Sequence, residues 1–129
     1  MGPYAHFGIV DDFDEHKDYG TFKDEEVHSF EDCLQKYHCI AIPDEIINDW
    51  WDKLMTMKSY HEHYACPKTA FARWGTTLIP PDSLGLFSEI IESCTSKKYL
   101  KLCQAELANL IILLKKAKCD NKFVIHYGV

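Results

Sequence analysis

The spacing of apolar residues in two segments constrains the fold of this chain more than any other feature. Apolar side chains recur every three or four positions between residues 46 and 57, and again between residues 99 and 117. Such spacing is typical of helices that bury one face. The two stripes are Ile46, Ile47, Trp50, Trp51, Leu54 and Met57, and Tyr99, Cys103, Leu107, Leu110, Leu114 and Ala117. We therefore expect two helices that pack on a shared core.

Two shorter patterns predict further helices. One indicates a helix that starts between Thr21 and Asp24 and ends near Lys36, and the other a helix that follows Pro80 and Pro81. Their inward-facing residues are Val27, Phe30, Leu34 and Tyr37 in the first, and Phe87, Ile90, Ile91 and Cys94 in the second.

Prolines and short polar residues predict where the helices begin and end. Pro43 suits the first turn of the helix over 46–57, which we expect to end at Tyr60 or as late as Ala65, before Pro67. The residues expected to cap the third and fourth helices are Asp82 or Ser83 and Thr95 or Ser96, respectively.

Four segments rich in aromatic and β-branched residues predict short strands, namely residues 4–10, 39–42, 75–79 and 122–129. The first and the last are alike in composition, and we expect these terminal strands to pair at the centre of a sheet. The predicted fold is α+β and mostly helical, with about four helices packed on a small sheet of short strands that includes both termini. The length of 129 residues fits a single domain over 1–129.

The sequence carries no pattern for export or membrane insertion. Its first residues lack the basic and apolar regions of a signal peptide, and the longest apolar run, Leu110 to Leu114, is far too short to span a membrane. We therefore expect a cytoplasmic protein. Its six cysteines are then expected to be reduced core residues, with a disulfide framework as the alternative.

Acidic residues are concentrated in the first 50 positions. The net charge of −6 combines a net of −10 in residues 1–50 with a net of +4 in residues 51–129. The acids between positions 11 and 32 are Asp11, Asp12, Asp14, Glu15, Asp18, Asp24, Glu25, Glu26, Glu31 and Asp32. Such a field attracts basic partners and repels nucleic acid and membrane phosphates, although a merely solvated surface is the alternative interpretation.

Two clusters contain metal-binding residue types, but neither forms a complete pattern. On a helix, His61 and His63 point to different sides, and no fourth ligand accompanies them and Cys66. The run from Asp11 to His16 lacks the glycine and the spacing of an EF-hand loop. We therefore predict neither a bound metal nor a cofactor.

Catalytic signatures are also missing from the sequence. Ser83 follows Pro-Pro-Asp rather than standing in a Gly-x-Ser-x-Gly elbow, and the six glycines are scattered singly, without a phosphate-binding loop. Trp50, Trp51 and Trp74 are expected in the core rather than on a base-stacking platform. These observations favour a binding protein over an enzyme, and neither nucleic acid nor a membrane is expected as its partner.

Residues 74–83 (WGTTLIPPDS) and 121–129 (NKFVIHYGV) resemble small bacterial immunity proteins of toxin–immunity loci, including those of contact-dependent growth inhibition. The resemblance covers a small part of the chain. It implies a cytosolic inhibitor that binds one cognate toxin domain, often a basic nuclease. It carries over no catalytic or binding residue, because the folds within this group vary.

The acidic segment is the predicted site for such a partner. Carboxylates there would speed association with a basic toxin, and aromatic residues beside them would anchor the complex. The predicted partner-binding residues are Asp11, Asp12, Asp14, Glu15, Asp18, Asp24, Glu25 and Glu26, with the aromatic Phe13, Tyr19 and Phe22. The run from Asp11 to Asp18 is expected to be a loop, and it is favoured as the interface because no helix end accounts for its acids.

Two other functions stay open on this sequence. A small enzyme or metal-binding protein would use the segment Asp11–His16 or the cluster His61–Cys66. An acidic mimic of nucleic acid would instead block a DNA-binding protein.

Overall fold

The computed structural model of the 129-residue chain describes residues 3–20 and 29–128. The strands in these ranges are β1 Tyr4–Val10, β2 Ile40–Pro43, β3 Lys58–His61, β4 Pro67–Thr69, β5 Thr76–Ile79 and β6 Phe123–Tyr127. The helices are α1 Phe30–Lys36, the 3-10 helix η1 Asp44–Ile46, α2 Ile47–Leu54, α3 Pro81–Cys94, α4 Lys97–Leu102 and α5 Gln104–Cys119. The predicted α+β class is confirmed, but the described residues contain more helices and a larger sheet than expected.

All six strands form one antiparallel sheet in the order β2-β1-β6-β5-β3-β4. The two ends of the chain meet inside this sheet, because β1 pairs with β6 from His6–Tyr127 to Val10–Phe123. The prediction that the terminal strands pair with each other is therefore confirmed. Since β2 and β5 flank this pair, neither terminal strand lies at an edge of the sheet.

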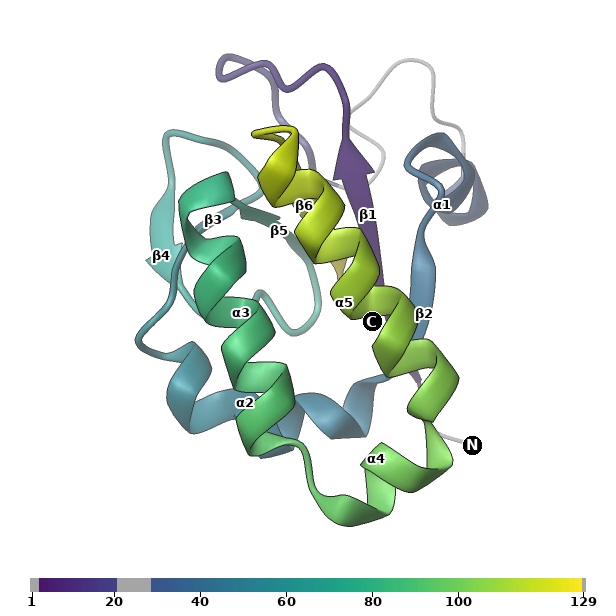
Figure 1. The fold of residues 1–129 in the computed structure, drawn as a ribbon. Helices are drawn as coiled ribbons and strands as arrows, with labels where there is room; N and C mark the ends of the chain where they lie inside the picture. Colours follow the sequence, from purple (N-terminus) through teal and green to yellow (C-terminus); the bar gives the residue numbers. More distant parts are fainter. Residues whose placement is uncertain (1–2, 21–28, 129) are drawn as a thin grey trace.

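Helices α3 and α5 lie side by side across one face of the sheet, and α2 packs against α3 (Figure 1). In this first core the Trp50 ring of α2 contacts the Phe87 ring of α3 at a centroid distance of 5.6 Å. The indole Nε1–H of Trp50 donates to Thr95 Oγ1 at 2.8 Å, so the polar atom of this buried ring has a partner. The predicted stripe of α5 is confirmed, because Leu107, Leu110, Leu114 and Ala117 are all buried.

The other face of the sheet carries a second apolar cluster. Side chains alternate along β6, so that Phe123, Ile125 and Tyr127 belong to this cluster while Val124 packs in the first core. The loop that follows β1 and helix α1 cover this face, and they bury Tyr19, Cys33 and Tyr37 against it. Both faces of the sheet are therefore covered.

The close approach of helix α1 depends on Gly8 in β1. A Cβ atom at Gly8 would lie 2.6 Å from the Tyr37 carbonyl oxygen and 2.9 Å from Cys39 Sγ. Any larger residue would push the end of α1 away from the sheet.

The second predicted helix is shorter than expected. Helix α2 ends at Leu54, and Lys58–His61 forms strand β3 between β5 and β4. The expected extension to Tyr60 or Ala65 is therefore wrong. The physical reason is that this segment pairs with β4 and β5, and Ser59 and Tyr60 are both buried because alternate residues of a strand point to opposite faces of the sheet.

The starts of the helices also differ from the predicted caps. Pro43 ends β2 and precedes η1. Pro80 caps α3 with Pro81 in its first turn, so Asp82 and Ser83 lie inside the helix and do not cap it. Ser83 Oγ instead donates to the Lys58 carbonyl at 2.7 Å, which ties α3 to β3.

The predicted fourth helix is two helices, α4 and α5, which meet at Cys103. Ser96 occupies the cap position of α4 but makes no capping hydrogen bond with its side chain. Thr95 ends α3, where its hydroxyl donates to the Ile91 carbonyl.

Helix α1 begins at Phe30, where Ser29 Oγ accepts a hydrogen bond from Asp32 N at 3.1 Å. Its end at Lys36 is as predicted. The expected start between Thr21 and Asp24 lies outside the described residues.

Solvent exposure corrects two predictions about the core. Trp74 is 86% exposed, whereas Trp50 is fully buried as expected. The six cysteines are free thiols, and two of them, Cys66 and Cys119, are exposed rather than buried.

A histidine lies in the middle of the first core. His126 stacks on the Phe71 ring at 4.5 Å and contacts the Phe7 ring at 5.0 Å. Its Nδ1 lies 3.3 Å from Thr77 Oγ1. Burial lowers the pKa of His126 from 6.5 to about 3, helped by the nearby positive charge of Arg73. This side chain is therefore neutral in the folded protein.

We predict that acid destabilises the protein through His126. Between pH 6.5 and about pH 3, His126 is protonated in the unfolded chain but neutral in the folded chain. Because the unfolded chain binds more protons in this range, the free energy of unfolding falls as the pH falls. The slope from this one group is roughly 1 kcal/mol per pH unit. Urea unfolding between pH 4 and pH 8 should therefore show a flatter pH dependence for His126→Gln than for the unsubstituted protein.

The free energy of unfolding of the His126→Gln variant still depends on pH to some extent, because burial lowers the pKa of His61 as well. The matched control is His16→Gln, because the His16 side chain is 86% exposed. It should keep the full slope, and an equal slope in His126→Gln would show that His126 does not cause the acid destabilisation.

Candidate partner-binding surface

The acidic loop over residues 11–20 begins next to the start of β6, because it follows strand β1. Val10, the last residue of β1, pairs with Phe123, the first residue of β6. Three positions further on, the Phe13 ring stacks on the Phe123 ring with a centroid distance of 3.7 Å and an interplanar angle of 4°. Phe13 also stacks on Tyr19, at 5.5 Å and 6°. Aromatic contacts therefore tie the loop over residues 11–20 to the sheet.

Tyr19 supports this loop from the buried side. Its side chain is 5% exposed, and its hydroxyl oxygen accepts a hydrogen bond from Asp14 N at 2.8 Å. Its own backbone N–H donates to the Glu62 carbonyl at 2.6 Å. Burial raises the pKa of the Tyr19 hydroxyl, which keeps it protonated. Because a buried ring offers little surface to a partner, the half-buried Phe13 is the better anchor of the two predicted aromatic residues that the structure describes.

Carboxylates of the loop hold its backbone in place. Asp14 Oδ1 accepts a hydrogen bond from His16 N, and Asp18 Oδ1 accepts one from Gly20 N, each at 2.8 Å. Such local turns restrict the chain to few conformations. Asp11 also pairs with Lys122 Nζ at 2.7 Å, and the hydrogen bond from Lys122 lowers the pKa of Asp11.

The structure brings five of the predicted carboxylates together on one exposed loop. These five are Asp11, Asp12, Asp14, Glu15 and Asp18. The other predicted residues, Phe22, Asp24, Glu25 and Glu26, lie outside the described residues.

Two hollows flank the aromatic side chains beside this loop. One, of about 520 Å³, is lined by Phe13, Asp14, Glu15, His16, Tyr64 and Phe123. The other, of about 500 Å³, is lined by Lys58, Tyr60, Tyr64, Pro80, Pro81, Asp82, Ser83, Asn121 and Phe123. Tyr64 and Phe123 line both hollows and therefore form the ridge between them.

Sequence reasoning missed Tyr64 and Phe123 as parts of this surface. A signal for Phe123 existed in the terminal strand, where apolar residues at both odd and even positions require cover on both faces of the sheet. Tyr64 had no such signal, because it lies in the turn between β3 and β4, and only the later predicted helix end, Ala65, includes this position.

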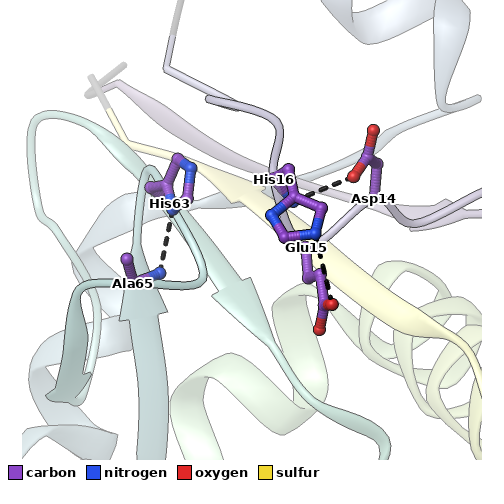
Figure 2. A network of polar contacts seen from close by, with 5 residues as sticks. All are labelled: Asp14, Glu15, His16, His63 and Ala65. Atoms are coloured by element: carbon purple, nitrogen blue, oxygen red, sulfur yellow. Dashed lines mark hydrogen bonds and ion pairs between the residues drawn. The ribbon is translucent and has the colours of Figure 1, made fainter.

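The candidate metal ligands make separate local contacts. Figure 2 shows His63 Nδ1 accepting a hydrogen bond from Ala65 N, while His16 contacts Glu15 at 3.4 Å. Within the described ranges, no three His, Cys, Asp or Glu side chains are placed to hold one metal ion.

A second exposed feature is the turn that carries Trp74. Beside it, the Arg73 guanidinium lies over the Trp51 ring at 5.3 Å and pairs with Asp44 at 2.8 Å. Gly128 packs against this turn so closely that a Cβ there would lie 2.1 Å from the Arg73 carbonyl oxygen. The turn is therefore held firmly, but no acidic group of the loop over 11–18 takes part in it.

No known protein family, curated protein or solved structure matches this chain. Among the helices of the described residues, none is long and apolar enough to cross a membrane. The interpretation of the surface therefore depends on its own chemistry.

We predict that Tyr19→Phe loosens the acidic loop without changing the fold. The substitution removes the acceptor of the Asp14 N–H, which costs about 1 kcal/mol of local stability. Hydrogen exchange should become faster at the Asp14 amide, while exchange in α5 should stay the same. Tyr99→Phe on α4 is the matched control, and equal acceleration in both variants would refute this role of Tyr19.

Proposed function

We propose that this chain is an immunity protein that binds a cognate toxin, with a basic surface such as that of a nuclease domain, and covers the active site of the toxin. The observation that carries the proposal is the exposed acidic loop over residues 11–18, seated on the Phe13–Phe123 stack. The resemblance of residues 74–83 and 121–129 to immunity proteins agrees with it.

The charge of the loop favours a basic protein as the partner. Residues 11–18 contain five carboxylates and one lysine, Lys17. A compact negative patch accelerates the encounter with a positive surface and opposes the approach of nucleic acid. The paired Lys122 offsets only the charge of Asp11.

The order of the loop supports binding of high affinity. Asp14 and Asp18 hold the backbone through short hydrogen bonds, and Tyr19 holds it from below. A loop that is ordered before the encounter loses less conformational entropy when it binds. The half-buried Phe13 ring next to these charges is the kind of side chain that anchors protein interfaces.

We propose binding rather than catalysis because the loop carboxylates are exposed to solvent, including Asp14 and Glu15 at the hollow beside Phe13. Catalytic acids and bases are usually set in a cleft that excludes water. Asp14 and Asp18 instead use an oxygen to fix the loop itself.

The direct test is binding to the product of the adjacent toxin gene. We expect a complex with a dissociation constant in the nanomolar range, typical of tight inhibitors, and loss of toxin activity at an equimolar ratio. If the two purified proteins do not bind at micromolar concentration, the proposal is wrong.

Charge reversal in the loop should slow association. We expect the double variant Asp12→Lys and Glu15→Lys to lower the association rate constant about tenfold at low ionic strength, with a smaller effect at high salt, because salt screens the attraction. Stopped-flow or surface-based kinetics would measure the change.

The matched control is the double variant Glu89→Lys and Glu92→Lys, which makes the same change of net charge on exposed positions of α3. It should leave the association rate nearly unchanged. An equal loss in both variants would show that only net charge matters, which contradicts a role of the loop.

A further inference from the structure

The hollow next to the acidic loop has aromatic walls and an acidic rim. Its volume is about 520 Å³, and Phe13, Tyr64 and Phe123 supply the aromatic part of its lining. Asp14 and Glu15 supply two carboxylates, of which Glu15 is 62% exposed. The same opening therefore combines apolar rings with negative charge.

Two of the three rings are parallel, and the third stands at a steep angle to both. Phe13 and Phe123 are parallel, with centroids 3.7 Å apart. The Tyr64 ring lies 5.7 Å from Phe13 and 6.0 Å from Phe123, and its plane is inclined by 71° and 74° to theirs. Tyr64 is therefore nearly equidistant from both rings and stands beside the stack rather than over it. Its side chain remains 38% exposed at the edge of the hollow.

This side of the protein already pairs two of its other rings with cations. Lys17 Nζ lies 5.2 Å from the centre of the Tyr19 ring, and Lys58 Nζ lies 5.5 Å from that of Tyr60. In the parts of the chain that the structure describes, no lysine or arginine takes such a position over Phe13, Tyr64 or Phe123. Among the described residues, these three rings thus have no cation over them, whereas the neighbouring Tyr19 and Tyr60 do.

We propose that this hollow receives one arginine side chain of the partner protein, with its guanidinium against the aromatic rings and paired with Glu15 or Asp14. Guanidinium suits the site better than ammonium, because it is planar, weakly hydrated, stacks on aromatic faces and matches a carboxylate with two donors. The inference rests on the proposed function, since it names the group of the basic partner that docks beside the loop.

A small probe tests the hollow without the partner. The full chain is titrated with N-acetyl-arginine amide, and the NMR signals of Phe13, Tyr64 and Phe123 are followed. We expect saturable shifts at these residues, with a dissociation constant in the millimolar range typical of one side chain. N-acetyl-citrulline amide has the same shape without the charge and should bind about tenfold more weakly.

Three outcomes of this titration would overturn the inference. Equal binding of the citrulline probe would show that the hollow selects shape and not charge. Equal or tighter binding of N-acetyl-lysine amide would refute the choice of guanidinium. Shifts confined to residues outside the hollow would refute the site.

Variants separate the inference from the proposed function. Tyr64→Ala should weaken the arginine probe about tenfold, whereas Tyr99→Ala should not. Glu15→Gln, an exposed substitution that leaves the fold intact, should weaken it several-fold even if Tyr64→Ala fails to fold. If the toxin binds but is insensitive to both Tyr64→Ala and Glu15→Gln, the inference fails and the proposed function stands. If the probe binds as described but the toxin does not, the hollow is an arginine-binding site and the proposed function fails.

Discussion

The pairing of β1 with β6 is the contact on which the rest of the structure depends. It joins the two ends of the chain through five residue pairs, from His6–Tyr127 to Val10–Phe123. Because both strands are interior strands, the sheet extends to both sides of them and presents two broad faces. Helices α3 and α5 cover only one of these faces (Figure 1). The other face is covered by helix α1 and by the segment that leaves β1, which is the acidic loop.

The position of the acidic loop is explained by its part in covering this face. Its apolar residues, Phe13 and Tyr19, turn towards the sheet and pack on the cluster that contains Phe123. Its carboxylates point to solvent, because burying an unpaired charge is costly. A single stretch of ten residues thus completes the second core and builds the charged surface. Stability and proposed binding are therefore linked through the same aromatic stack.

The predictable parts of the fold are those where one local pattern dominates. The stripe in α5, the strand over residues 4–10 and the pairing of the termini all follow from spacing and composition. The strand over Lys58–His61 could not be predicted in this way, because it depends on pairing with β5. The local sequence contains no information about that contact. The prediction that Trp74 lies in the core is wrong for a similar reason, since only the tertiary structure places its turn on the surface. For the site, the charges were visible in the sequence, whereas Tyr64 comes from a turn distant along the chain.

We propose that the acidic loop with its aromatic support is the surface that meets the partner. Hydrogen exchange of the whole chain, measured alone and in complex with the toxin, tests it most directly. We expect new protection in residues 11–18 and in the neighbouring turn around Tyr64. Protection confined to α4 and α5, or to the turn that carries Trp74, with no change in the loop, would contradict this proposal.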